Sequence, residues 1–128
     1  MNRREAAALA GTGGNDPAEA IVGRLRALGL ARGVITQGSG PIVGFDAFHV
    51  FSTAPPAPRT VADVTGAGDA LAGAMTVALL NGEPFGEALR EGMAAALLAV
   101  ESPTSVPELP KRVFAEALAL VPVPKEMR

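Results

Sequence analysis

The sequence contains no cysteine, a single histidine and only two lysines, and each scarcity removes a class of chemistry. Without cysteine there is no disulfide framework and no thiolate nucleophile, which fits a cytoplasmic protein. The lone histidine, His49, leaves no histidine cluster for a metal ion, and its place between aromatic residues favours solvent or a strand edge. Lys111 and Lys125 both lie near the carboxyl end, which disfavours a catalytic Schiff base.

Long apolar runs and familiar nucleotide motifs are missing as well. No run of ~18 apolar residues is present to span a bilayer, and residues 1–5 do not lead into the apolar core of a signal peptide. There is no P-loop sequence, and Leu71 breaks the dinucleotide-binding spacing of glycines. A net charge of −2 gives no reason to expect nucleic acid or a membrane surface as a partner. With 48% apolar residues, the 128-residue chain suits one domain over 1–128.

The stretch 63–70, Asp-Val-Thr-Gly-Ala-Gly-Asp-Ala, is the most informative part of the sequence. It reads as a glycine-rich turn that opens into a small-residue helix over 70–80. Glycines let several backbone N–H groups point at one spot, and a helix N-terminus behind them favours an anion. Asp69 would repel a phosphate there unless it accepts a proton from the attacking nucleophile. The alternative is a helix start with an Asp placed favourably against the helix dipole.

This stretch resembles the second signature of the ribokinase-like (PfkB) carbohydrate and nucleoside kinases, Asp-Thr-Thr-Gly-Ala-Gly-Asp, with only Val64 departing. The resemblance implies a ribokinase-like three-layer α/β/α fold, of which this chain is the C-terminal, nucleotide-binding portion. It also implies ATP as cofactor and Asp69 as the catalytic base. The backbone of Gly66, Ala67 and Gly68 would form the anion hole for the transferring phosphoryl group.

The same family carries an Asn-x-x-Glu motif that helps to hold the water shell of Mg²⁺. Asn2 and Glu5 match this motif, and an ion that keeps most of its waters needs few protein ligands. An Asn followed three residues later by Glu is also an ordinary helix capping box, and the sequence does not separate the two interpretations. The helix would span 3–10.

Four further positions follow from the resemblance. Family members carry Thr-x-Gly beside the nucleotide phosphates, and Thr36 and Gly38 match it at the end of an expected strand over 33–38. Asp63 and Thr65 correspond to a loop that binds a monovalent cation in relatives, which makes Thr65 a candidate for cofactor binding and Asp63 for metal binding.

The remaining pattern predicts alternating helices and strands, and therefore an α/β protein. We expect a helix from 17 to 28, strands at 41–45 and 48–51, a helix over 86–100, a loop over 101–110 that borders the nucleotide, and a helix over 111–120.

The sequence thus predicts transfer of the ATP γ-phosphoryl to a primary hydroxyl of a sugar or nucleoside. The Val-Thr-Gly-Ala-Gly-Asp-Ala-Leu form and the stretch from Glu101 to Leu109 are most similar to pseudouridine kinases. Ribokinase-like enzymes are more than twice as long, so the chain would work with an N-terminal half or as a homodimer. The competing hypothesis is a nucleotide-binding or structural remnant without turnover.

Overall fold

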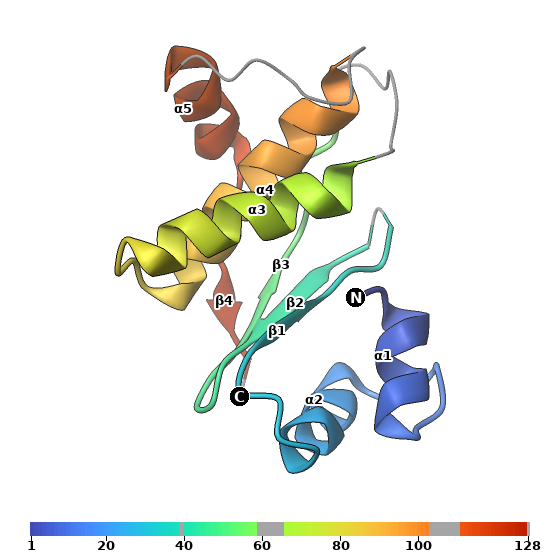
Figure 1. Cartoon of the computed structure of the whole chain (residues 1–128). Coiled ribbons are helices and arrows are strands. Elements are labelled where there is room, and N and C mark those ends of the chain that lie inside the picture. Colours follow the sequence, from blue (N-terminus) through green and yellow to red (C-terminus); the bar gives the residue numbers. More distant parts are fainter. Residues whose placement is uncertain (39, 59–65, 103–110, 128) are drawn as a thin grey trace. The chain divides into compact units, whose positions relative to one another are not determined.

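The computed structural model describes residues 1–38, 40–58, 66–102 and 111–127 (Figure 1). The sequence suggested one domain, and the contacts within the chain divide it into two compact units. The first comprises Met1–Ala54 with Pro124–Arg128, and the second comprises Pro55–Val123. Among the described residues, no helix is long and apolar enough to cross a bilayer.

The first unit combines two helices with a small antiparallel sheet of strand order β1-β2-β3-β4. Its elements are α1 (Arg3–Ala10), α2 (Ala18–Ala27), β1 (Gly33–Ile35), β2 (Ile42–Phe45), β3 (Val50–Thr53) and β4 (Lys125–Glu126). Besides the antiparallel pairs, an isolated parallel bridge joins Asn2 to Thr36. The helices α1 and α2 therefore connect two parallel segments, as in a βαβ unit.

The core of the first unit lies between the two helices and the first two strands. Its buried side chains are Ala6, Ala7, Ala10, Ile21, Val22, Leu25, Ile35, Val43 and Phe45. The Phe45 ring packs directly over Gly33, where an added Cβ would lie 2.8 Å from the ring. Arg26 donates from α2 to the carbonyls of Asp46 and His49, and so holds the turn between β2 and β3. His49 itself is exposed, as its sequence context indicates.

The second unit consists of three helices, α3 (Ala67–Leu80), α4 (Phe85–Glu101) and α5 (Lys111–Leu120). Gly92 of α4 allows close approach to α3, because a Cβ there would lie 2.5 Å from Met75 Cγ and 2.9 Å from the carbonyl oxygen of Leu71. Arg90 donates to the carbonyls of Leu118 and Val121, at 3.0 and 2.9 Å. The Leu118 carbonyl also accepts from the amide of Val121 at 3.1 Å, so Arg90 joins α4 to the carboxyl end of α5.

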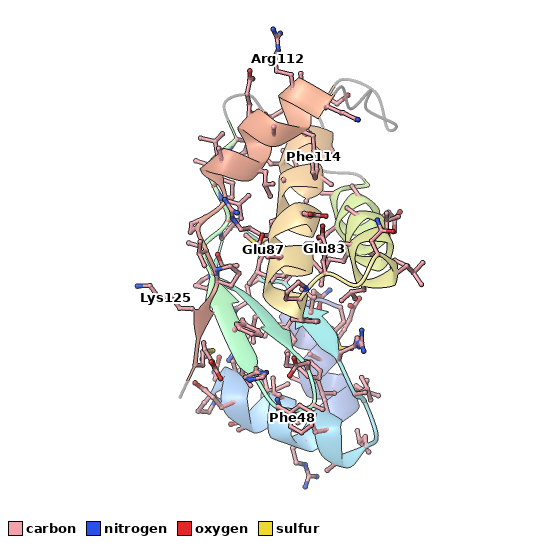
Figure 2. All side chains as sticks on the ribbon, turned by 90° about the vertical axis from the view of Figure 1, so that its left-hand side faces the viewer. Phe48, Glu83, Glu87, Arg112, Phe114 and Lys125 are labelled. Carbon is pink, nitrogen blue, oxygen red and sulfur yellow. The ribbon has the colours of Figure 1, made fainter. Side chains whose placement is uncertain are left out.

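Acidic side chains gather along α4 and the turn before it, where Figure 2 labels Glu83 and Glu87. Burial raises the pKa of Glu91 to about 7, and the hydrogen bond and charge of Glu83 and the charge of Glu87 act in the same direction. The Oε2 atom of Glu83 is buried and has no hydrogen-bond partner among the residues that the structure describes. Glu91 is therefore protonated in the folded chain at pH values where an ordinary glutamate has lost its proton.

This proton makes the stability of the chain depend on pH. The folded-state pKa of Glu91 is raised, so the unfolded chain binds fewer protons between pH about 5 and about 7. The free energy of unfolding should therefore fall as pH rises through that window, by roughly 1–2 kcal/mol after solvent screening. Urea unfolding at both ends of the window measures the change. Glu91→Gln should flatten the dependence, whereas Glu116→Gln on α5 should leave it intact; equal slopes in both variants would contradict this assignment.

Most elements predicted from the sequence are present. The helices expected over 3–10 and 111–120 have those bounds, and those expected over 17–28 and 86–100 differ by one residue at each end. Helix α3 begins at Ala67, three residues earlier than expected, because the residues after Gly66 already take up helical conformation. Strand β4 was not anticipated, since two exposed residues carry no periodic signal. Most of the expected loop over 101–110 lies outside the described residues.

Candidate functional site

The N-terminus of α3 presents backbone N–H groups that have no acceptor in the part of the chain that the structure describes. Gly66 is the N-cap residue, with φ of 88° and ψ of −5°, and it provides no capping side chain. This left-handed conformation is readily available only to glycine. The amide of Ala70 donates to the carbonyl of Gly66 at 2.9 Å, and this hydrogen bond closes the first turn of the helix. The N–H groups of Ala67, Gly68 and Asp69 precede it and have no backbone acceptor among the described residues.

These donors make the start of α3 suited to an anion. They lie at the positive end of the helix dipole, which adds roughly half a positive charge. Gly68 is exposed, and an added Cβ would meet nothing within 4 Å. No neighbour among the described residues therefore requires a glycine at position 68, whereas a ligand lying against the backbone would.

The carboxylate of Asp69 lies in the first turn of α3 and is exposed to solvent. The sequence placed it on the turn before the helix; the structure places it within the helix. An acidic residue in a first turn is stabilised by the dipole, so this position alone also fits the purely structural interpretation. What distinguishes it is the absence of any partner for the carboxylate among the described residues, which leaves it available to accept a proton.

Asn2 and Glu5 form the capping box of α1. The Oδ1 atom of Asn2 accepts from the amide of Glu5 at 2.8 Å, and Glu5 Oε2 accepts from the amide of Asn2 at 2.9 Å. Both side chains are exposed, and the box leaves Asn2 Nδ2 and Glu5 Oε1 unused. The capping box that the sequence allowed is therefore formed. The second carboxylate oxygen of Glu5 is not used by the box and could bind the water shell of an ion.

The structure brings Thr36 to the same place as Asn2. The amide of Thr36 donates to the carbonyl of Met1 at 3.0 Å, and the carbonyl of Thr36 accepts from the amide of Arg3 at 2.9 Å. Gly38 follows with φ of 60° and is exposed. Both motifs therefore stand at the carboxyl ends of parallel segments, which is where open α/β sheets bind ligands.

The remaining candidates are not placed. Asp63 and Thr65 lie outside the described residues. The described portion of the chain holds no cluster of three or more His, Cys, Asp or Glu side chains suited to a metal ion. The candidate residues thus fall into two groups, Asn2, Glu5, Thr36 and Gly38 in the first unit and Gly66, Ala67, Gly68 and Asp69 in the second.

Sequence reasoning missed the pairing of residues 1–3 with β1. The backbone of Met1 and Arg3, rather than any side chain, fixes Asn2 beside Thr36. Three residues are too few for a strand pattern to be visible. The only available signal was that two separate family motifs fell at 2–5 and 36–38.

Comparison with known proteins places the chain in a family. The sequence pattern of the pfkB family carbohydrate kinase matches residues 1–112. Among solved structures, a carbohydrate kinase from Agrobacterium tumefaciens is 38% identical, with a TM-score of 0.77, and the match covers 99% of this chain and 40% of that one.

Two further structures show the same fold. Arabidopsis thaliana ribokinase complexed with ribose and ATP is 27% identical, with a TM-score of 0.77, over 91% of this chain and 39% of that one. Phosphofructokinase-2 from Escherichia coli in complex with potassium is 22% identical, with a TM-score of 0.75, and the match covers 92% of this chain and 38% of that one. None of the curated proteins matches this chain. These matches confirm the predicted ribokinase-like α/β fold. The chain spans about 40% of the length of the matched structures. The chain belongs to the pfkB family of carbohydrate kinases.

Proposed function

We propose that this chain carries the phosphoryl-transfer centre of an ATP-dependent kinase that acts on a primary hydroxyl of a sugar or nucleoside. The observation that carries the proposal is the first turn of α3, which holds both the carboxylate of Asp69 and backbone N–H groups without an acceptor among the described residues. A phosphoryl group needs the first feature, and a hydroxyl nucleophile needs the second. Family membership supports both roles.

The steps follow from the charges involved. The Asp69 carboxylate accepts the proton of the substrate hydroxyl as the hydroxyl oxygen attacks the γ-phosphorus of ATP. The bond from the γ-phosphorus to the β–γ bridging oxygen breaks, and ADP leaves. Negative charge then accumulates on the transferring phosphoryl group, and the backbone N–H groups at Ala67 and Gly68 stabilise it together with the helix dipole. The flexible backbone of Gly66 allows the chain to turn into the helix at this point.

The cofactors are assigned by the same reasoning. Thr36, Gly38 and Thr65 are the residues that we assign to ATP binding on the family resemblance. Asn2 and Glu5 would hold Mg²⁺ through its water shell, and the ion would supply positive charge that offsets the charge of the phosphates. A monovalent cation near Asp63 is supported by the potassium complex of the E. coli relative. Ribose in the plant relative supports a sugar substrate, and the resemblance at 64–71 keeps pseudouridine as a second candidate.

A catalytically silent nucleotide-binding or structural remnant is the second candidate, because an exposed acidic residue in the first turn of α3 also fits a purely structural role. An assay of ATP-dependent phosphorylation of ribose, fructose and pseudouridine separates the two hypotheses. Transfer to any of these substrates supports the kinase. Tight Mg-ATP binding without transfer, in a preparation that contains the whole fold, supports the remnant.

The variant Gly68→Ala tests whether a ligand lies against the α3 backbone. Its Cβ would meet none of the residues that the structure describes, and alanine favours a helix, so thermal unfolding should show unchanged or slightly raised stability. The same methyl group would lie against the phosphoryl group, so ATP binding or transfer should fall about tenfold or more. If the variant keeps full nucleotide affinity and activity, the anion hole does not lie at Gly68.

A further inference from the structure

Strand β4 is the segment by which the chain returns to the first unit, and it lies at one edge of the described sheet. It has only two residues, and both are exposed. It pairs antiparallel with β3 (Figure 1), and the amide of Met127 extends the ladder by donating to the carbonyl of Val50 at 2.6 Å. A short and exposed edge strand opens locally at a much lower cost than the unfolding of the whole unit.

His49, the only histidine of the sequence, lies between two carboxylates that come from different elements. Its Nδ1 atom is 3.3 Å from Oδ1 of Asp46, in the turn from β2 to β3, and its Nε2 atom is 3.8 Å from Oε1 of Glu126 on β4. The Phe51 ring packs beside the imidazole, with 5.8 Å between the ring centroids, and Phe51 is the residue of β3 opposite Glu126. One imidazole therefore joins the turn before β3 to the neighbouring strand β4.

The carboxylate of Asp46 is held in place and in its charged form by the turn itself. Burial acts to raise the pKa of Asp46, but the amides of Phe48 and His49 donate to its Oδ1 atom at 2.8 and 2.7 Å and the imidazole adds to their effect, so that the pKa is lowered. Asp46 therefore carries its charge over the range of about pH 5 to 8, in which histidine side chains gain or lose theirs.

The other charged groups around the imidazole do not change charge in that range. Arg26 of α2 donates to the carbonyls of Asp46 and His49. Lys125 precedes Glu126 on β4 and points to the opposite face of the sheet. Arginine, lysine and exposed carboxylates stay charged between about pH 5 and 8. Within the described part of this cluster, only the imidazole changes charge there. Its attraction to Glu126 is present at the acidic end and is lost as the pH rises.

We propose that His49 is a pH-dependent latch that holds β4 on β3, because its protonated imidazole attracts the Glu126 carboxylate and its neutral form does not. Met127, which follows β4, packs partly buried against the core of the first unit, so opening of β4 would uncover an apolar contact as well as the edge of β3. An exposed ion pair adds little to the stability of a whole protein, but it is a substantial share of the stability of a two-residue strand.

Hydrogen exchange at the amide of Met127, followed by NMR on the whole 128-residue chain, tests the latch. The protection factor is the exchange rate of an unstructured peptide at the same pH divided by the observed rate. It should fall about fivefold between about pH 5.5 and 7.5, because exposed ion pairs are weak, and the midpoint should coincide with the titration of the His49 ring. The amide of Leu25, inside α2, reports opening of the whole unit, and the fall at Met127 should exceed any fall there.

Three variants and a salt series identify the groups involved. His49→Gln keeps a polar side chain that does not titrate, so the protection factor of Met127 should lose its pH dependence. Glu126→Gln removes the charge on β4 and should remove most of the dependence. Lys125→Gln changes a charge on the same strand but on the other face, and should keep the wild-type profile. Salt at about 1 M screens exposed charges and should flatten the wild-type profile.

A protection factor at Met127 that is independent of pH in the wild-type chain would overturn the proposal. So would a wild-type profile in His49→Gln or in Glu126→Gln. Circular dichroism shows whether these variants fold, and if they do not, the salt series on the wild-type chain decides, since an unchanged profile at about 1 M salt contradicts an electrostatic latch. None of these readouts uses a nucleotide, so the latch can fail while the proposed function stands, and the reverse.

Discussion

Asp69→Asn is expected to abolish phosphoryl transfer while leaving Mg-ATP binding nearly intact. Asparagine has the same shape as aspartate but does not accept a proton, and loss of a general base lowers rates about 10²–10⁴-fold. The exposed first-turn position tolerates asparagine without a change in packing. The measurement compares the rate of substrate phosphorylation and the affinity for Mg-ATP in preparations where the wild-type chain transfers phosphoryl.

The matched control for this prediction is Glu87→Gln. Glu87 is the acidic residue in the first turn of α4, as Asp69 is in the first turn of α3. Its loss should leave transfer within about twofold of the wild type, because a general helix-dipole effect contributes less than about 1 kcal/mol. Persisting transfer in Asp69→Asn, or equal losses in the two variants, would remove Asp69 from the role of base.

The largest effect on stability is expected from Gly92→Ala. The new methyl group would lie 2.5 Å from Met75 Cγ and 2.9 Å from the backbone oxygen of Leu71, and the backbone of α3 cannot move away as a flexible side chain can. Overpacking of this kind costs about 3 kcal/mol, which is a large fraction of the stability of a small protein. Chemical denaturation should show a clearly lower midpoint.

Gly73→Ala on α3 is the control for this substitution. Gly73 lies in the interior of a helix, is exposed, and has nothing within 4 Å of an added Cβ. The same exchange should therefore raise the free energy of unfolding by roughly 0.5–1 kcal/mol through helix propensity. If both variants are equally stable, the close contact between α3 and α4 at Gly92 does not contribute as described.

The sequence was sufficient where local chemistry decides the structure. The helix over 3–10 is fixed by Asn2 and Glu5, whose reciprocal hydrogen bonds form the capping box that their spacing indicates. The turn at Gly66 could be predicted because glycine readily takes the left-handed conformation that other residues avoid, and Gly66 has that conformation. Family membership followed from the same stretch, and the match over residues 1–112 confirms it.

Long-range contacts could not be read from the sequence. The bridge between Asn2 and Thr36 joins backbone groups that carry no residue-specific pattern. The close approach at Gly92 depends on which helix packs against it, and the sequence identifies only a small residue in an apolar stripe. The raised pKa of Glu91 likewise depends on burial and on its hydrogen bond with Glu83. The separation of the two residues in the sequence does not show that their side chains meet. The roles of the candidate site residues stay predictions.

Calorimetric titration of Mg-ATP into the 128-residue chain tests the central claim most directly. The start of α3 predicts saturable binding of one nucleotide per chain, weakened about tenfold or more by Gly68→Ala and nearly unchanged by Asp69→Asn. A folded chain that shows no heat of binding, or that binds equally well with Gly68→Ala, would contradict the assignment of a nucleotide phosphate site to the N-terminus of α3.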